Sequence, residues 1–227
     1  YTPYLCKIVH QLGGFAEVVS TMEYQLAHKL GVPDKKIIFN GPYKLKTDFT
    51  AAAFGGATIN LDSEIDIEMA ENFAIEHPEV KVNLVLRCNF ELRKNEISRF
   101  GLDVMDDSFA SAVARIKSHH SLELTGLHCH FPDRDLESFG LRVHELVKLA
   151  KELFPDSAPR TLNIGGGYFS NMPSSLGNSF KVPPASFEDY GRLVGGILTG
   201  AYPNEDDRPT LFLEPGTALV ADAFSFF

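Results

Sequence analysis

The sequence has few of the features of secreted, membrane-spanning or nucleic-acid-binding proteins. Only three of its 227 residues are cysteine, and none of them forms a C-x-x-C pair. Such a usage is typical of a reducing compartment and favours the cytoplasm. No apolar run approaches the roughly 18 residues of a membrane span. The net charge of −9 argues against nucleic acid as a partner. We therefore expect a cytoplasmic protein with neither a membrane nor a nucleic-acid partner.

The usual signals at the two chain ends are also missing. The sequence begins at Tyr1 with neither an initiator methionine nor a signal peptide, and it stops in the apolar run 223–227 without a helix cap. We expect it to be a piece of a longer protein.

Short apolar runs alternate with helical patterns along the chain, which predicts parallel strands with helices outside. The predicted strands begin at Phe15, Lys36, Ala57, Lys81, Leu122, Arg160 and Thr210. One more strand before Tyr1 would give eight, so the expected fold is a (β/α)8 barrel domain that includes residues 1–227. The alternative is a doubly wound open sheet. That fold expects a G-x-G-x-x-G loop after its first strand, and the sequence has none there.

Three predicted strands end in residues that carry chemistry. The strand at Arg160–Ile164 runs into Gly165, Gly166 and Gly167, whose backbone N–H groups have no side chain in front of them. After strands seven and eight a barrel often binds phosphate, so we interpret the glycines as a phosphate cradle. The alternative is a loop that only needs positive φ angles.

The last predicted strand runs into Glu214, Pro215 and Gly216. A carboxylate just past a buried strand could cap a helix or lie at the surface. It could also accept a hydrogen bond from a cationic ring nitrogen and so keep that nitrogen protonated. A heterocycle bound at its nitrogen by Glu214 and at its phosphate by the glycines describes pyridoxal phosphate.

The strand at Leu122–Leu127 ends in His128, Cys129 and His130. The two histidines could form a metal pair, but the sequence offers no evident third ligand, so we expect no metal. A stacking or acid–base role suits His130 better, whereas His128 is interpreted as a core residue. Asn163, inside its strand, is interpreted as structural.

Two further charged residues lie on predicted strands. Arg87 ends an apolar strand and implies an anionic partner, which a carboxylate of the protein itself could equally supply. Glu17 lies inside the first strand and could face the barrel, where it would be either functional or merely paired.

The order of the motifs resembles a known family. The segments that carry the resemblance are EVVSTMEYQLAHKLGVPDKKIIFNGPYK, INLDSE, LVLRCN, RFG, GLHCH, NIGGGY and EPGTALVADAF. Together they resemble the fold type III pyridoxal-phosphate decarboxylases, which include the ornithine, arginine, diaminopimelate and carboxynorspermidine decarboxylases, with alanine racemase more distant. The resemblance implies an alanine-racemase-like barrel, a separate β-domain outside this chain and a homodimer.

The resemblance also implies a role for each site residue. His130 would stack on the cofactor ring and Glu214 would pair with its nitrogen, so these two are the predicted catalytic residues. The other predicted cofactor-binding residues are Gly165, Gly166, Gly167, Gly216, Thr217, Arg87 and Glu17. The family's Schiff-base lysine would precede Tyr1.

The sequence departs from the family pattern at two places. Pro132 and Asp133 stand where Gly-Ser is usual, and Thr217 stands where an arginine usually meets the phosphate. A hydroxyl brings no charge to a phosphate, so we expect weaker or rearranged phosphate binding. The predicted reaction is loss of CO2 from an amino acid or an amino-acid-derived intermediate. The alternatives are an amino-acid racemase, a zinc-dependent hydrolase and a non-catalytic cofactor-binding protein.

Overall fold

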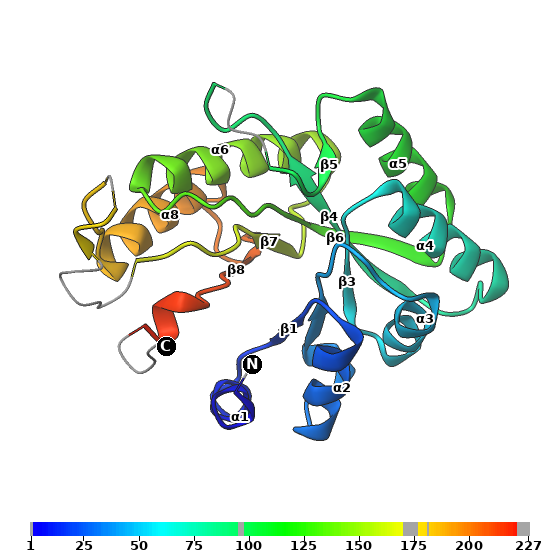
Figure 1. Ribbon diagram of the computed structural model, residues 1–227. Helices are drawn as coiled ribbons and strands as arrows, with labels where there is room; N and C mark the ends of the chain where they lie inside the picture. The colour runs from blue at the N-terminus through cyan, green and yellow to red at the C-terminus, as the bar shows by residue number, and fades with distance from the viewer. Residues whose placement is uncertain (1, 95–97, 170–176, 181, 222–227) are drawn as a thin grey trace. The chain divides into compact units, whose positions relative to one another are not determined.

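The computed structural model describes residues 2–94, 98–169, 177–180 and 182–221 (Figure 1). These residues fall into two compact units. The first contains the described residues of Tyr1–Phe90 and Arg99–Thr125, and the second contains those of Glu91–Ser98 and Gly126–Phe227. Strands and helices alternate along the chain in both, as the sequence predicted. No helix of the described residues is both long and apolar enough to cross a membrane.

The first unit is built on parallel strands β1-β2-β3-β4, and short β5 pairs with the end of β4. The beginning of β6 lies beside β4, where Val82 N donates to Ser121 O at 2.9 Å. The elements of this unit are α1 (Pro3–Gln11), β1 (Ala16–Val18), α2 (Thr21–Lys29), the 3-10 helix η1 (Asp34–Lys36), β2 (Ile37–Phe39), α3 (Lys46–Gly55), β3 (Thr58–Leu61), α4 (Glu64–Glu76), β4 (Val82–Asn89), β5 (Leu102–Asp103), α5 (Asp107–Ser118) and the start of β6 (Leu122–His128).

The second unit contains parallel strands β6, β7 and β8, with β7 between the other two. Helices α6 and α8 pack side by side. The Phe139 ring of α6 contacts the Tyr190 ring of α8 edge-on, and the ring centroids are 4.7 Å apart. The elements of this unit are the end of β6, α6 (Leu136–Leu153), β7 (Thr161–Asn163), α8 (Phe187–Ala201), β8 (Thr210–Phe212) and the 3-10 helix η2 (Thr217–Leu219).

Helix starts follow local capping chemistry. The sequence Ser20-Thr21-Met22-Glu23 predicts a capping box at the start of α2. Ser20 accepts a hydrogen bond from Glu23 N at 3.3 Å, as that motif requires. The Glu23 carboxylate reaches Val19 N at 2.7 Å instead of the cap residue's own N–H. Asp135 caps α6 by accepting from Ser138 N at 3.0 Å. Each cap satisfies a backbone donor that the helix leaves without a partner.

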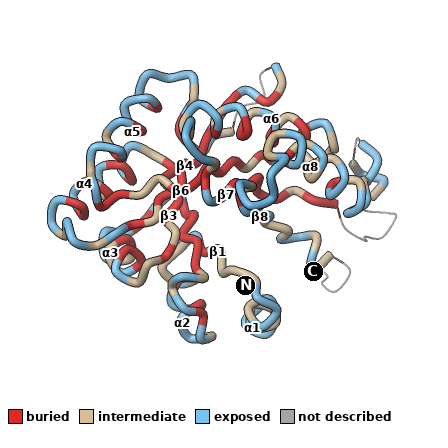
Figure 2. Tube along the Cα trace, turned by 180° about the vertical axis from the view of Figure 1, so that it is seen from behind, coloured by how far each residue is buried: buried red, intermediate tan, exposed pale blue. Residues whose placement is uncertain are grey.

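The core of each unit lies between its strands and the inner faces of its helices. Figure 2 shows buried residues following the strands, while the outer turns of the helices are exposed. In the first unit Ile59, Leu84 and Leu86 have no exposed surface, and in the second Leu127 and Leu146 have none. Burial of this apolar surface is the dominant favourable contribution to folding.

Strand β4 is longer than the sequence predicted. The sequence predicts a strand of Val and Leu over Lys81–Leu86 that ends at Arg87, but β4 continues through Arg87 to Asn89. The charged side chain does not end the strand because Arg87 Nη1 donates to Asp62 Oδ2 at 2.9 Å inside the unit. The last two residues of β4 pair with β5.

Candidate active site at the ends of strands six to eight

Strand register brings the predicted residues of the second unit to one place. His128 pairs with Asn163, and Asn163 pairs with Phe212, so these three residues form one row across β6, β7 and β8. His130, Gly165 and Glu214 each follow that row by two residues. Because parallel strands carry their C-terminal ends at the same edge of a sheet, all three must meet there.

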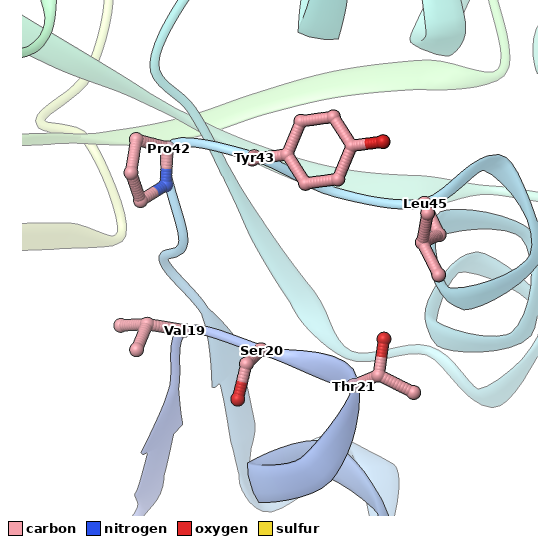
Figure 3. A pocket seen from close by; sticks show the side chains of 6 residues that line it. All are labelled: Val19, Ser20, Thr21, Pro42, Tyr43 and Leu45. Atoms are coloured by element: carbon pink, nitrogen blue, oxygen red, sulfur yellow. The ribbon is translucent and has the colours of Figure 1, made fainter.

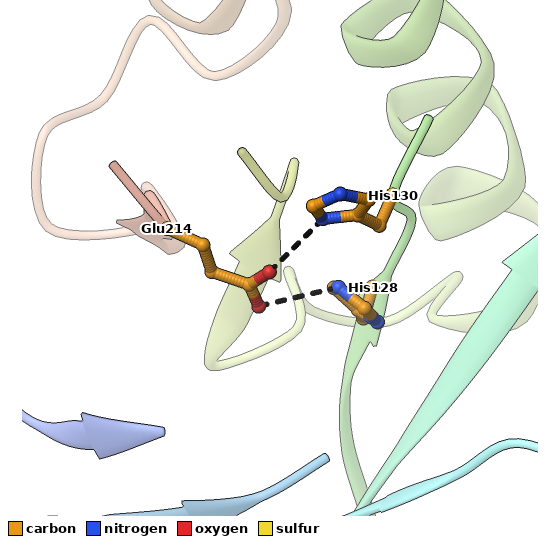
Figure 4. Close-up of side chains that lie close together, drawn as sticks. All are labelled: His128, His130 and Glu214. Atoms are coloured by element: carbon orange, nitrogen blue, oxygen red, sulfur yellow. Dashed lines mark hydrogen bonds and ion pairs between the residues drawn. The ribbon is translucent and has the colours of Figure 1, made fainter. Parts of the chain in front are cut away.

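The side chains at this edge contact one another (Figure 4). His130 Nδ1 lies 3.2 Å from Glu214 Oε2, and His128 Nε2 lies 3.3 Å from Glu214 Oε1. Gly166 N donates to His130 Nδ1 at 3.2 Å. The prediction that the three strand ends face one another is confirmed for these residues.

Glu214 is almost buried, with its side chain 10% exposed. Burial alone would raise the pKa of Glu214, but the neighbouring imidazoles of His128 and His130, with His128 contributing most, outweigh it and hold the pKa well below its usual range. Glu214 is therefore ionised at neutral pH. It offers a fixed carboxylate to a cationic partner.

Asn163 has a larger part in the site than its sequence position suggested. Its Nδ2 donates to Glu214 Oε1 at 2.8 Å, and its Oδ1 accepts from Gly165 N at 2.9 Å. One side chain thus fixes both the carboxylate and the first glycine of the cradle. The sequence signal was a polar residue in the middle of a buried strand, which we interpreted as structural.

The glycine loop leaves no room for side chains. Gly165 and Gly167 have φ angles of 71° and 97°, a region that favours glycine. A Cβ at Gly165 would lie 2.7 Å from both Cys129 O and His130 Nδ1, and one at Gly166 would clash with Glu214 O. The loop backbone is therefore packed directly against the other two strand ends.

Gly216 and Thr217 lie beyond this cluster. Both are exposed at the start of η2, and Gly216 N donates to Glu214 O at 2.8 Å. Their contact with a cofactor stays a prediction.

The first unit places Arg87 and Glu17 in separate polar networks. The anionic partner of Arg87 is Asp62, which also accepts from Gly101 N at 2.6 Å. Glu17 accepts from Asn40 Nδ2 at 2.9 Å. Their predicted cofactor contacts stay predictions.

Sequence reasoning did not single out the buried ion pair between Lys44 and Asp66 in the first unit. Lys44 Nζ lies 2.9 Å from Asp66 Oδ2, and both side chains are almost fully buried. Burial lowers the pKa of Lys44 and raises the pKa of Asp66, while each charge acts against the shift of the other. The signal was a lysine directly after a strand and turn.

A cavity of about 250 Å³ in the first unit contains none of the predicted site residues (Figure 3). Its lining residues are Val19, Ser20, Thr21, Pro42, Tyr43 and Leu45.

Comparison with known proteins identifies the family. Residues 2–221 match the family described as pyridoxal-dependent decarboxylase, pyridoxal binding domain. The chain belongs to this family. It is therefore a domain of the kind that binds pyridoxal phosphate, as the resemblance implied.

Two curated relatives are diaminopimelate decarboxylases. The Aquifex aeolicus enzyme is 25% identical over 239 residues, covering 98% of this chain and 53% of the relative. The Methanocaldococcus jannaschii enzyme is 26% identical over 238 residues, covering 96% of this chain and 51% of the relative. This pyridoxal binding domain thus spans about half the length of these relatives.

Solved structures agree with the predicted fold class. Diaminopimelate decarboxylase from M. jannaschii superposes with a TM-score of 0.82 at 25% identity, covering 97% of this chain and 52% of that one. Arginine decarboxylase of the Paramecium bursaria Chlorella virus has the same fold, with a TM-score of 0.71 at 20% identity over 95% of this chain and 55% of that one. The expected fold, the barrel of the pyridoxal-phosphate decarboxylases, is confirmed.

Proposed function

We propose that the protein is a pyridoxal-phosphate-dependent amino-acid decarboxylase and that this chain holds the cofactor. The observation that carries the proposal is the convergence of Glu214, His130 and the glycine loop at one sheet edge. A deeply set carboxylate beside the glycine loop, where Gly167 N has no acceptor among the described residues, matches the two polar ends of pyridoxal phosphate. The tight packing of the glycines supports the fit, because it leaves backbone and not side chains facing the site.

Each residue has a distinct part in this proposal. Glu214 accepts a hydrogen bond from the ring N–H, and its depressed pKa keeps it ionised for that purpose. His130 has a side chain 39% exposed, so part of its ring is open to stacking. When bound, pyridoxal phosphate supplies the electron sink for loss of CO2. Asn163 keeps Glu214 and Gly165 in register.

The hydrogen bonding of His130 favours a ligand with an N–H donor. Its Nδ1 faces both Gly166 N, a donor, and Glu214 Oε2, an acceptor. One nitrogen carries either a proton or a lone pair, so only one of the two contacts can be a hydrogen bond at a time. A ligand that donates to Glu214 would leave Nδ1 to accept from Gly166. Both contacts of the carboxylate and of the loop would then be satisfied.

The substrate class follows from the relatives. Because the curated relatives are named diaminopimelate decarboxylases, diaminopimelate is the first substrate to test. An acidic or conjugated amino acid is the second, because Pro132, Asp133 and Thr217 depart from the family pattern. A homodimer and a cytoplasmic location are also part of the proposal, and sedimentation of the purified protein tests the first.

The test is an absorption spectrum of the purified protein before and after borohydride, followed by CO2 release from a panel of amino acids. We expect a visible cofactor band that borohydride removes, and CO2 from at least one amino acid. Inversion of the α-carbon without CO2 would indicate a racemase. A band without turnover of any panel member would indicate a protein that only binds the cofactor.

A zinc-dependent hydrolase is the second candidate, and one observation favours it. His128, His130 and Glu214 each offer a ligand atom, and these atoms lie within 4.8 Å of one another. Glu214 thus supplies the third ligand that the sequence did not reveal, and three protein ligands are the usual set of a catalytic zinc site. A colourless protein with stoichiometric zinc by elemental analysis would support this candidate and contradict the decarboxylase.

A further inference from the structure

Arg142 on helix α6 is a charged residue at the centre of an apolar face. It is completely buried, and its neighbours on the same face include Phe139, Val143 and Leu146. Its guanidinium lies over the Phe139 ring, 4.2 Å from the ring centroid. A buried charge is costly unless its hydrogen bonds are made, so its contacts need an explanation.

All five N–H groups of the guanidinium have an acceptor. Nε donates to Ser138 Oγ at 3.1 Å on the same helix. The other four donors reach backbone carbonyls. Nη1 donates to Ile164 O at 3.4 Å and Gly166 O at 2.9 Å. Nη2 donates to Phe131 O at 3.2 Å and Asp133 O at 2.6 Å. A guanidinium has five donors, so the match is complete.

These carbonyls belong to two loops. Phe131 and Asp133 lie in the segment directly after His130, and Ile164 and Gly166 belong to the glycine loop. One side chain therefore ties the two loops together. Pro132 and Asp133, which stand where the family pattern has Gly-Ser, are the residues in the middle of this contact.

The contacts also orient backbone donors. In a trans peptide the C=O and the next N–H point in opposite directions. Because Gly166 O and Asp133 O point at Arg142, the N–H groups of Gly167 and Arg134 point away from it. Within the described part of the chain, neither N–H has a hydrogen-bond acceptor. Such outward-facing amides are the usual ligands of an anion.

The charge of Arg142 has no carboxylate partner within hydrogen-bond distance among the described residues. The carboxylates whose charges act on Arg142 are those of Asp133, whose carbonyl and not carboxylate receives the bond, and Asp135, which pairs with Arg93. Burial lowers the pKa of Arg142, but a guanidinium starts so high that it stays charged. The second unit thus carries a fixed positive charge directly behind the glycine loop.

We propose that Arg142 is a positioning residue for the phosphate of the cofactor. It holds the two loops with their amides facing outward, and it supplies from behind the positive charge that Thr217 does not bring. The inference rests on the proposed function, since it assumes that the glycine loop binds a phosphate. In this proposal Arg142 takes the place of the arginine and the Gly-Ser that the family pattern has and this sequence lacks.

The test compares pyridoxal phosphate with pyridoxal, which lacks the phosphate, as ligands of the full chain. Arg142→Met removes the charge and all five donors while keeping an unbranched apolar stem. The matched control is Arg192→Met, on α8, where the arginine side chain is 80% exposed. Dissociation constants are measured by fluorescence titration after each variant has been checked for folding by circular dichroism.

We expect Arg142→Met to raise the dissociation constant of pyridoxal phosphate about tenfold or more, which corresponds to the loss of one hydrogen bond to a charged group. The dissociation constant of pyridoxal should change by less than twofold. Arg142→Lys should lie between the wild type and Arg142→Met, because one ammonium keeps the charge but has three donors for five acceptors. Arg192→Met should bind both ligands like the wild type.

The proposal would be overturned if Arg142→Met weakened the binding of both ligands equally, or weakened the binding of neither. If Arg142→Met does not fold, the same comparison with Arg142→Lys decides, because that variant must still lose affinity for the phosphate ligand only. Binding of inorganic phosphate separates the two proposals. A wild type that binds phosphate, loses it in the Arg142 variants and never binds pyridoxal would contradict the cofactor and support the phosphate site.

Discussion

Replacing Glu214 by glutamine isolates the charge of the carboxylate at nearly constant shape. Asn163 Nδ2 can still donate to the glutamine oxygen, so the 2.8 Å contact that fixes the side chain is kept. What is lost is the charge that His128 and His130 stabilise. A hydrogen bond to a charged group contributes about 1.5–3 kcal/mol and a neutral one about 0.5–1.5 kcal/mol. The difference of about 1–1.5 kcal/mol corresponds to about tenfold in the dissociation constant of pyridoxal phosphate.

The assay is titration with pyridoxal phosphate, followed by CO2 release at saturating cofactor. The rate should fall further than the affinity, because a neutral glutamine does not keep the ring nitrogen protonated. Glu205→Gln, on an exposed loop, is the matched control and should leave both values unchanged. A Glu214→Gln variant with wild-type affinity and wild-type turnover would refute the role assigned to the carboxylate.

Four other outcomes follow from the described contacts. Because the folded-state pKa of Glu214 is depressed, the free energy of unfolding should fall as the pH drops below the ordinary value of 4.5. In Glu214→Gln the free energy of unfolding should depend less on pH in this range, as measured by urea titrations at each pH. Gly166→Ala should abolish pyridoxal phosphate binding, because its Cβ would clash with the carbonyl oxygen of Glu214; retained affinity would contradict the packing. Asn163→Ala should cost about 1–3 kcal/mol of stability by leaving Gly165 N and the carboxylate without this partner, measured by denaturation in urea. Lys44→Met should lower the free energy of unfolding by about 3–5 kcal/mol, because it leaves the buried Asp66 carboxylate without its cationic partner. A double variant with Asp66→Leu should recover most of this loss.

The strands and helices were largely readable from the sequence, because their signals are local. Apolar runs of four to six residues gave the strands, and the capping pattern at Ser20 gave the start of α2. The extension of β4 through Arg87 was not readable. It depends on Asp62, which lies 25 residues away and removes the cost of burying the guanidinium.

The site was partly readable for the same reason. Three strand ends with chemical side chains could be expected to meet, and His130 and Glu214 do meet. The role of Asn163 could not be read, since its partner Glu214 lies 51 residues further along the chain. For Arg142 a signal was present: a charged residue at a position where the helical period of α6 demands an apolar one.

Four of the five bonds from Arg142 end on main-chain oxygens, and a main-chain oxygen is present in every kind of residue. Replacement of Asp133 by another residue would therefore leave its carbonyl acceptor for Arg142 in place. Pro132 is exposed and Asp133 is half-buried, so both positions can accept other side chains, whereas the Phe131 ring is buried near Arg142. The three glycines have no such freedom, because each is hemmed in by backbone or by His130. Within one small region, the fold separates positions that can diversify from positions that cannot.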